Sequence, residues 1–166
     1  MLDKLRAQMA AFLAAHDVAI LTTASSTGAW AMPARYLARG LEVDCLVPRW
    51  ADAAHHLARD PRVLLVMPSQ ISDFGFRISD GQTAPQSATL RLRSGEVRKS
   101  RSAGLCWLQL QGTAQLVAEP DWSGLLPDWT SAVAPGDLYL VVRVTPARLD
   151  LFDESQGWGA RETVEM

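Results

Sequence analysis

The sequence predicts a mainly β (β+α) protein, an antiparallel barrel of about six strands with flanking helices. Segments with strand character recur along the chain, and most of them are joined by short, hairpin-like links. A helix is expected between the third and fourth strands, whereas an alternating β/α fold would need one after nearly every strand. The six segments with strand character are 18–24, 29–38, 41–47, 62–68, 105–119 and 137–153.

The chain begins with a segment that predicts an amphipathic helix ending near His16-Asp17. Apolar residues repeat there at helical spacing, whereas Asp3, Lys4 and Arg6 lie off the apolar stripe. We expect no signal peptide, because the segment is charged early and has no small-residue cleavage site. No apolar run is long enough to cross a bilayer, so we expect a cytoplasmic protein with no membrane partner.

The first two strand segments are separated by the turn sequence SSTG (25–28), in which Gly28 is free to take a positive φ. The first segment, VAILTTA (18–24), has the apolar character of a buried strand. In the second, alternation places Trp30, Met32, Ala34 and Tyr36 on one face, with Pro33 and Arg35 on the other. Proline cannot donate a ladder hydrogen bond, so Pro33 indicates a sheet edge or a bulge.

The third strand segment, LEVDCLV (41–47), alternates strictly between apolar and acidic residues. Its acidic residues, Glu42 and Asp44, share one face, and we interpret that face as solvated rather than as a catalytic pair. The helical segment ADAAHHLARD follows, with Leu57 and either Ala53 or Ala54 expected on its buried side. The fourth strand is RVLLVMP (62–68).

Residues 69–104 interrupt this pattern, although we expect residues 1–166 to form one domain. The interruption is rich in Ser, Gly and Arg and has little periodicity. A loop of this length within a compact domain is usually functional or disordered. Two interpretations stay open: a solvated, mobile insertion, or a lid or arm that reaches a partner subunit or an anionic ligand.

The last strand segments flank residues 120–136, which we interpret as short helical turns. Within 105–119, Gly112 indicates a bulge or bend, and the last segment is expected to bend at Thr145-Pro146. Alternation divides the segment 105–119 into two faces: Leu108, Leu110, Ala114 and Leu116 inward, with Trp107, Gln109 and Gln111 opposite.

Composition and motifs exclude several functions. A net charge of −2 and an isoelectric point near 5.9 give no basic face for nucleic acid or for an anionic membrane. The chain has no GxSxG, GxxxxGK[ST], HExxH or Rossmann glycine pattern, so no catalytic residue is assigned. Cys45 and Cys106 lie in apolar runs without metal-type spacing, and we interpret both as small buried side chains.

A metal site is not expected either. His55 and His56 are neighbours on a predicted helix, so their side chains point roughly 100° apart. Asp52 and His56 are four residues apart and are able to share an ion, but His16 is the only further histidine. We therefore expect at least one of the paired histidines to be solvated.

Trp158 lies between two glycines near the C-terminus, with little apolar company in the sequence. A large aromatic side chain in such a position is expected to cover a ligand ring or a partner chain. The alternative is a fraying tail.

The order of these segments resembles the pyridoxamine 5′-phosphate oxidase-like FMN-binding split barrels. The resemblance rests mainly on HLARDPRVLL at the helix-to-strand corner and on QGTAQLV in the fifth strand segment. It covers most of the chain outside 69–104 and 120–136, and it implies an antiparallel split β-barrel. It also implies a homodimer with two flavin sites at the subunit interface and a small-molecule redox substrate.

The resemblance further implies which residues surround the cofactor. Residues 35–36 match positions that line the flavin, and 47–50 match a strand end beside the ring and the ribityl chain. Residues 107 and 109 match a strand face near the ring, and the C-terminal segment matches tails that approach the ligand. The implied cofactor-binding residues are Arg35, Tyr36, Val47, Pro48, Arg49, Trp50, His56, Trp107, Gln109, Trp158 and Arg161.

The chain departs from the resemblance where the phosphate of FMN would be held. Flavin-binding members often carry Ser-x-Lys at the start of the short helix, whereas this chain has Ala51, Asp52 and Ala53. A phosphate would then rely on Arg35, Arg49, a protonated histidine of the pair, or an arginine of the insertion. Three alternatives stay open: a haem or deazaflavin protein on the same barrel, a non-enzymatic dimer that stores or senses a ligand, and a barrel that has lost its cofactor.

Overall fold

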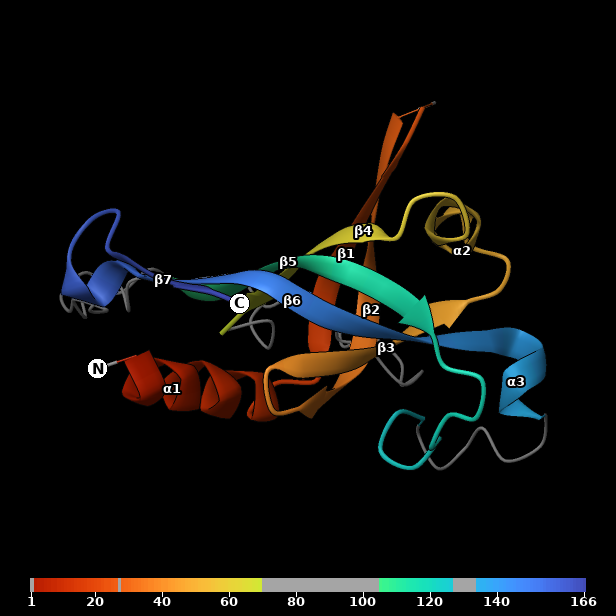
Figure 1. The fold of residues 1–166 in the computed structure, drawn as a ribbon, viewed down its shortest axis with the longest axis horizontal. Coiled ribbons are helices and arrows are strands. Elements are labelled where there is room, and N and C mark those ends of the chain that lie inside the picture. Colours follow the sequence, from red (N-terminus) through yellow and green to blue (C-terminus); the bar gives the residue numbers. More distant parts are fainter. Residues whose placement is uncertain (1, 27, 70–104, 127–133) are drawn as a thin grey trace, which may run out of the picture.

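A computed structural model describes residues 2–26, 28–69, 105–126 and 134–166. Its β-sheet has the strand order β3-β2-β1-β4-β5-β6-β7, and a further pairing of β3 with β6 closes six of these strands into a barrel. Every pairing is antiparallel. The predicted mainly β, antiparallel barrel with flanking helices is therefore confirmed (Figure 1).

The elements agree with the predicted order. The helix α1 and the strand β1 come first. The two further α-helices in the described part of the chain are short. A 3₁₀ turn, Glu154–Gln156, follows β6. The elements in chain order are α1 (Leu2–Ala14), β1 (Val18–Ser25), β2 (Gly28–Arg39), β3 (Glu42–Pro48), α2 (Asp52–Leu57), β4 (Arg62–Pro68), β5 (Cys106–Leu116), α3 (Pro135–Leu138), β6 (Tyr139–Asp153) and β7 (Arg161–Glu165).

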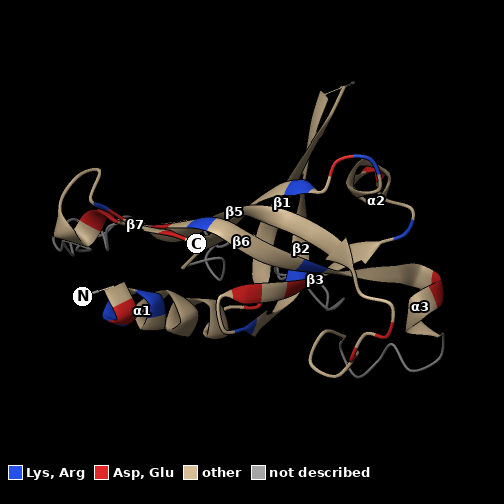
Figure 2. Cartoon of the chain, in the orientation of Figure 1, with Lys and Arg blue, Asp and Glu red and all other residues tan. Residues whose placement is uncertain are grey.

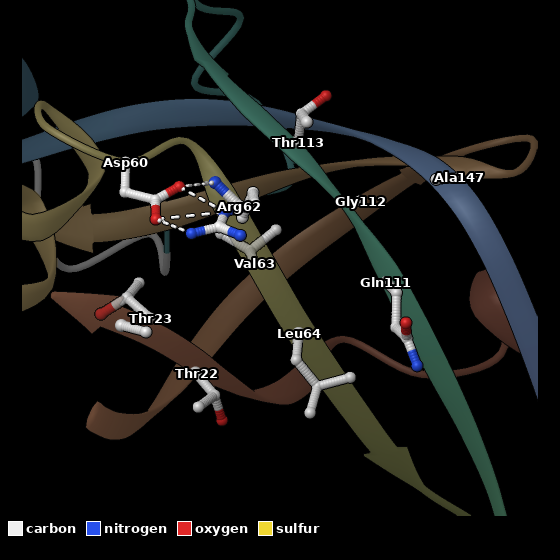
Figure 3. A pocket seen from close by; sticks show the side chains of 11 residues that line it. Thr22, Thr23, Asp60, Arg62, Val63, Leu64, Gln111, Gly112, Thr113 and Ala147 are labelled. Carbon is white, nitrogen blue, oxygen red and sulfur yellow. Dashed lines mark hydrogen bonds and ion pairs between the residues drawn. The ribbon is translucent and has the colours of Figure 1, made fainter. Parts of the chain in front are cut away.

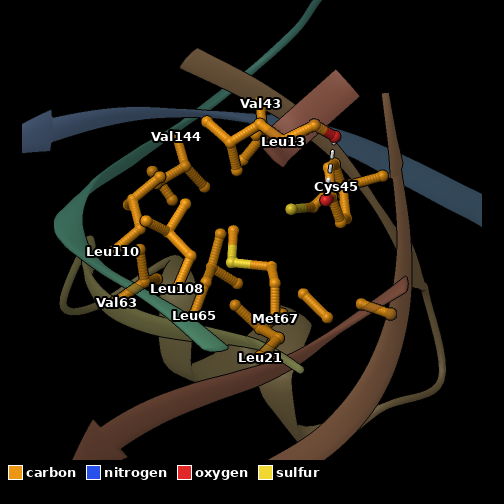
Figure 4. Packing of buried hydrophobic residues seen from close by; sticks show 14 of the residues in the cluster. Leu13, Leu21, Val43, Cys45, Val63, Leu65, Met67, Leu108, Leu110 and Val144 are labelled. Carbon is orange, nitrogen blue, oxygen red and sulfur yellow. Dashed lines mark hydrogen bonds between the residues drawn. The ribbon is translucent and has the colours of Figure 1, made fainter. Parts of the chain in front are cut away.

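The barrel encloses one apolar core, which Figure 4 shows from close by. Alternate residues of each strand point into it, and α1 adds Met9 and Leu13. The phenol of Tyr36 donates a 3.0 Å hydrogen bond to the Leu13 carbonyl, which ties β2 to the end of α1. The alternation predicted for β3 is confirmed on this side, because Val43, Cys45 and Val47 are buried.

The hairpin of β1 and β2 extends beyond the barrel (Figure 1). β4 pairs with β1 only at residues 20–23, and β3 pairs with β2 only at residues 36–39. The parts of β1 and β2 next to their connecting turn therefore pair only with each other. Pro33 of β2 lies at an edge of the sheet, as its missing N–H predicts. Gly28 has a φ of 140° in the connecting turn, as expected.

The acidic face of β3 differs from the prediction. Asp44 is 2% exposed rather than solvated, because arginines from both neighbouring strands cover it. Arg143 on β6 donates to Asp44 at 2.8 and 3.0 Å, and Arg39 on β2 forms a second ion pair. Figure 2 shows acidic and basic residues together where these strands meet. Burial alone raises the pKa of Asp44, but the hydrogen bonds from Arg143 and Arg39 outweigh it and hold the pKa below its ordinary value.

The long strands β5 and β6 shift register at Gly112, where a bulge was expected. Gln111 pairs with Arg148 and Gly112 with Pro146, so Ala147 is the extra residue and the bulge lies in β6. A side chain at Gly112 would overlap the Thr145 carbonyl. The inward position predicted for Leu116 is wrong: it is 65% exposed, because β4 pairs with β5 only as far as Thr113.

The C-terminal segment forms a strand that the sequence pattern did not indicate. β7 pairs with the second half of β6, beyond the part of β6 that pairs with β3. Val164 of β7 is buried, and α1 packs nearby. Of the helical turns expected in 120–136, α3 is observed, and 120–126 form a bend and a turn.

Two further expectations lie wholly or partly outside the described residues. The insertion at 69–104 is described only at Ser69, so neither interpretation of it is tested, and residues 127–133 of the segment expected to form helical turns also lie outside. In the described part of the chain, none of the helices combines the length and the apolar character that a membrane span requires.

Candidate functional site

The first group of predicted site residues lies at the end of β3. Val47 is buried in the core and Pro48 is half-buried beside Tyr139, so neither side chain is freely exposed. Arg49 and Trp50 project from the turn that follows, and Trp50 is 84% exposed. The Nε of Arg49 donates a 2.6 Å hydrogen bond to the Gly136 carbonyl, which orients the guanidinium and leaves its terminal nitrogens without a partner among the described residues.

Arg35 and Tyr36 are adjacent on β2 and face opposite sides. The Arg35 side chain is exposed, and it forms an ion pair of 3.5 Å with the exposed carboxylate of Asp17. Tyr36 is 2% exposed, and burial raises the pKa of its phenol above the ordinary value. Arg35 is therefore open to an anion, whereas Tyr36 offers a ligand only its backbone.

The second group lies on the outer face of β5, β6 and β7. Trp107 stacks on Phe152 with ring centroids 4.6 Å apart and the planes 8° from parallel. Arg161 lies over the Phe152 ring, with its guanidinium carbon 5.3 Å from the ring centroid. Gln109, two residues after Trp107 on the same face, is half-buried opposite Asp150. These side chains form a preordered aromatic and cationic surface.

Asp150 anchors this surface and is fully buried. Its carboxylate accepts hydrogen bonds from Arg161 at 2.9 and 2.8 Å, from Thr163 at 2.6 Å and from Arg148 at 3.2 and 3.0 Å. Burial raises the pKa of Asp150, but the hydrogen bonds from Thr163, Arg161 and Arg148 outweigh it, so the pKa is below its ordinary value. Asp150 is therefore a structural anion rather than a proton donor near neutral pH.

Trp158 lies in the turn between the 3₁₀ segment and β7 and is 97% exposed. Two residues separate it from Arg161, so an aromatic residue and an arginine are again close in sequence at a chain turn. Trp158 covers no other described residue, and the expectation that it covers a ligand ring or a partner chain stays a prediction.

The two groups lie far apart on a single chain. Arg49 N–H donates to the Leu138 carbonyl just before β6, whereas Trp107 is paired with Phe152 near the end of β6. Positions 138 and 152 are fourteen steps apart along the chain, which corresponds to roughly 45 Å along an extended strand. The end-of-β3 group and the β5–β7 face therefore meet on one ligand only if different copies of the chain contribute them.

The histidines have separate surroundings. His55 is exposed, as expected for one of the pair, whereas the Nδ1 of His56 is 3.1 Å from the buried hydroxyl of Thr23. His16 is bonded through Nδ1 to the Phe12 carbonyl at 2.7 Å. Among the described residues no three metal-ligating side chains come together, and no metal site is proposed.

The phosphate position expected at the short helix is unusual. Ala51 is the N-cap of α2 and makes no side-chain capping bond, and Asp52 adds a negative charge to the first turn. The cysteines offer no alternative chemistry, because burial raises the pKa of Cys45 to about 12 and also raises the pKa of Cys106.

A hollow of about 620 Å³ lies elsewhere on the outer surface of the barrel, across β1, β4, β5 and the bulge of β6 (Figure 3). None of the eleven predicted site residues lines it. Thr22, Leu64 and Gln111 form its walls, and Gly112 and Ala147 also line it. Sequence alternation identified Gln111 as outward-facing, but nothing in the sequence joined these strands into one hollow.

The rim of this hollow carries an ion pair between Asp60 and Arg62. Arg62 Nε lies 3.0 and 3.1 Å from the two carboxylate oxygens, and one terminal nitrogen lies 2.6 Å from Oδ2. These hydrogen bonds, with a further one from the Arg62 backbone, lower the pKa of Asp60 to about 2. Both residues belong to the sequence ARDPR (58–62) at the helix-to-strand corner. In the sequence, this corner indicated the resemblance to the split-barrel family through its residue pattern and not through its charges.

Comparison with known proteins finds likeness in structure only. No protein-family model matches the chain, and no curated protein matches its sequence. Among solved structures, a putative pyridoxamine 5′-phosphate oxidase from Listeria innocua is 18% identical with a TM-score of 0.59, covering 89% of this chain and 98% of that one. The resemblance stated above is therefore confirmed at the level of the fold, the split barrel.

Two further similar structures differ in what their names say they bind. A FAD-binding protein from Mesorhizobium loti is 14% identical with a TM-score of 0.56, covering 86% of this chain and 89% of that one. A haem-binding protein from Mycobacterium smegmatis is 19% identical with a TM-score of 0.56, covering 96% of this chain and 57% of that one.

Proposed function

We propose that this chain, a split barrel of the pyridoxamine 5′-phosphate oxidase-like kind, binds FMN as a homodimer and acts as a flavin-dependent oxidoreductase on a small-molecule redox substrate. The fold supports a flavin or a haem, since similar structures include a FAD-binding and a haem-binding protein. The choice of a flavin rests on the arrangement of this chain's own side chains.

The observation that carries the proposal is a pair of exposed arginine–tryptophan units. Arg49 and Trp50 are adjacent at the end of β3, and Trp158 and Arg161 are three positions apart where the chain enters β7, with the Arg161 guanidinium held by Asp150. Their tryptophans are 84% and 97% exposed, although large aromatic side chains normally lose most of their contact with water. A planar ring with an anionic tail matches both partners of such a unit, because indole stacks on the ring and guanidinium binds phosphate.

The proposed site is shared between two copies. One copy contributes the end-of-β3 group, and the partner contributes the β5–β7 face with Trp107, Gln109 and Arg161. This division follows from their separation along β6 within one chain. It also gives Trp158, which covers none of the described residues of its own copy, a ligand to cover.

The side chains have separable roles in this proposal. Arg49, held by the Gly136 carbonyl, binds phosphate with its terminal nitrogens, and Arg35 adds a second positive charge. Trp50 and the Trp107–Phe152 stack pack against the ring, and Gln109 hydrogen-bonds its polar rim. The bound flavin would supply the redox chemistry, while the protein supplies binding, orientation and exclusion of water.

Several aromatic side chains are available to contact the flavin ring, whereas few cationic residues are available to bind the phosphate. Asp52 and the alanines of α2 place no cation at the short helix, so Arg49 and Arg35 carry the phosphate charge in the described part of the chain. A deazaflavin would use the same surfaces, and a haem would need an accessible imidazole such as that of His55.

The test is the absorption spectrum of the purified full-length protein, followed by titration with FMN, haemin and a deazaflavin. We expect a two-banded yellow spectrum, or saturable FMN binding by a colourless preparation. A Soret band would replace the proposal with haem binding. A colourless protein that ignores all three cofactors would indicate a barrel without a cofactor.

A further inference from the structure

A second binding site is built on the outer surface of the barrel, apart from the residues to which the flavin is assigned. The hollow across β1, β4 and β5 continues into a smaller one of about 380 Å³, and the two share Ala24, Asp60 and Arg62. Together they form a groove, here called the corner groove, that runs from the bulge in β6 to the corner before β4. None of the eleven residues implied in cofactor binding lines either part.

The two ends of the corner groove differ in chemistry. The larger end is mostly apolar, with Leu64, Gly112 and Ala147 in its lining. The smaller end is polar and is lined by Ala24, Ser25, Ser26, Arg59, Asp60 and Arg62. Such a division matches a ligand with an apolar body and a polar head.

The polar end carries one more positive than negative charge. Asp60 engages Arg62 through Nε and one terminal nitrogen, which holds the guanidinium in place and leaves the other terminal nitrogen open. Arg59 is exposed and has no partner among the described residues. Two guanidinium groups at one end of a groove, one of them preordered, form a site for an oxyanion.

The apolar end lies at the bulge. Ala147, the extra residue of the bulge, is exposed and contributes only a methyl group to the lining. Gly112 contributes only backbone to the lining, because a Cβ there would overlap the Thr145 carbonyl. Leu64 on β4 supplies a flat apolar wall beside it (Figure 3).

We propose that the corner groove binds a flat, apolar small molecule that carries a single oxyanion group, such as a carboxylate, sulfonate or phosphate. The apolar body lies over Leu64 and Ala147, and the oxyanion is held by Arg59 and by the free terminal nitrogen of Arg62. This site does not depend on flavin binding, and because it lies apart from the residues assigned to the flavin, a ligand there acts as an effector rather than as the redox substrate.

The test uses two fluorescent probes on the full chain: 1-anilinonaphthalene-8-sulfonate and its uncharged analogue N-phenyl-1-naphthylamine. We expect both to bind saturably. Arg59→Gln should weaken the sulfonate probe by roughly fivefold, the effect of losing one charge-assisted contact at an exposed site, and leave the uncharged probe unchanged. Ala147→Leu should fill the apolar end and weaken both probes. Arg6→Gln, an exposed arginine on α1, is the matched control and should change neither.

Methyl NMR of the unmodified protein provides a reading that needs no variant. The sulfonate probe should shift the methyl signals of Leu64, Thr22 and Ala147 more than those of the core. Equal weakening by Arg59→Gln and Arg6→Gln would overturn the proposal, and so would methyl shifts confined to other surfaces. Displacement of the sulfonate probe by FMN would also overturn it as a separate site. Probe binding by a protein that binds no FMN would support the corner groove and contradict the proposed function alone.

Discussion

Arg161 is held between a buried carboxylate and an aromatic face: it donates to Asp150 at 2.9 and 2.8 Å and lies over the ring of Phe152. Its guanidinium is therefore positioned before any ligand arrives. The same ring carries Trp107 in a parallel stack. The outer face of β5–β7 thus presents a preorganised surface, the property that lowers the entropic cost of binding a rigid ring.

Arg49→Ala should weaken FMN binding by about tenfold or more, because the substitution removes charge-assisted hydrogen bonds to a phosphate. Stability should change little, since the Arg49 side chain is exposed and, among the described residues, makes a hydrogen bond only to the Gly136 carbonyl. The measurement is titration of FMN followed by flavin fluorescence, with urea unfolding as the check on stability. Arg6→Ala is the control, and equal FMN affinity of Arg49→Ala and the parent would remove Arg49 from the site.

Mixing two variants tests whether the site is shared between copies. Arg49→Ala and Trp158→Ala should each bind FMN weakly, and both should run as dimers in light scattering. If each site combines Arg49 of one copy with Trp158 of the other, exchanged heterodimers regain one intact site. An equimolar mixture should therefore recover about a quarter of the high-affinity sites, since random exchange makes half of the dimers mixed.

The result of mixing is decisive in both directions. No recovery after verified subunit exchange would mean that Arg49 and Trp158 serve the same copy or that one of them is outside the site. A monomer at micromolar concentration would contradict the shared site directly.

Asp150→Asn should lower the free energy of unfolding by about 1–3 kcal/mol at neutral pH. A buried pair that loses one partner usually costs more, but the arginines here are over a third exposed and remain partly solvated. Urea unfolding measures the change, and Asp3→Asn in the first turn of α1 is an exposed control. A variant as stable as the parent would show that the network only positions Arg161.

The lowered pKa of Asp150 also predicts how the stability of the protein depends on pH. Its pKa is lowered in the folded protein, so its contribution is present above the unfolded pKa and is lost as the pH falls through the lower folded pKa. The loss should begin below about pH 4, the ordinary range of an aspartate. Asp150→Asn should therefore lose less stability than the parent between neutral pH and acid, and parallel curves would contradict this account.

Gly112→Ala should destabilise the barrel by about 1–3 kcal/mol, the usual effect of overpacking. Its Cβ would overlap the Thr145 carbonyl and lie 3.1 Å from the Pro146 Cα, and neither backbone atom has room to move cheaply. Gly136→Ala is the matched control, because its Cβ would meet only the Trp122 side chain at 3.8 Å. Thermal unfolding of both variants is the measurement, and equal stabilities would show that the bulge adapts.

The candidate site was predictable from the sequence only in part. Arg49, Trp50, Trp158 and Arg161 were singled out by composition and by the resemblance, and their exposure agrees with roles in binding. Their separation within one chain was not predictable, because it depends on which part of β6 pairs with β3 and which with β5. The corner groove was missed because its residues come from segments that only the sheet brings together.

The sequence by itself determined six of the seven described strands and most of their inward faces, because alternation and helical spacing are local properties that follow from where each side chain points. Only the tertiary structure decided what lies opposite each strand. Asp44 is buried by Arg143, 99 residues away, and Leu116 is exposed because β4 ends before it. Register and barrel closure join distant segments, and no local pattern contains that information.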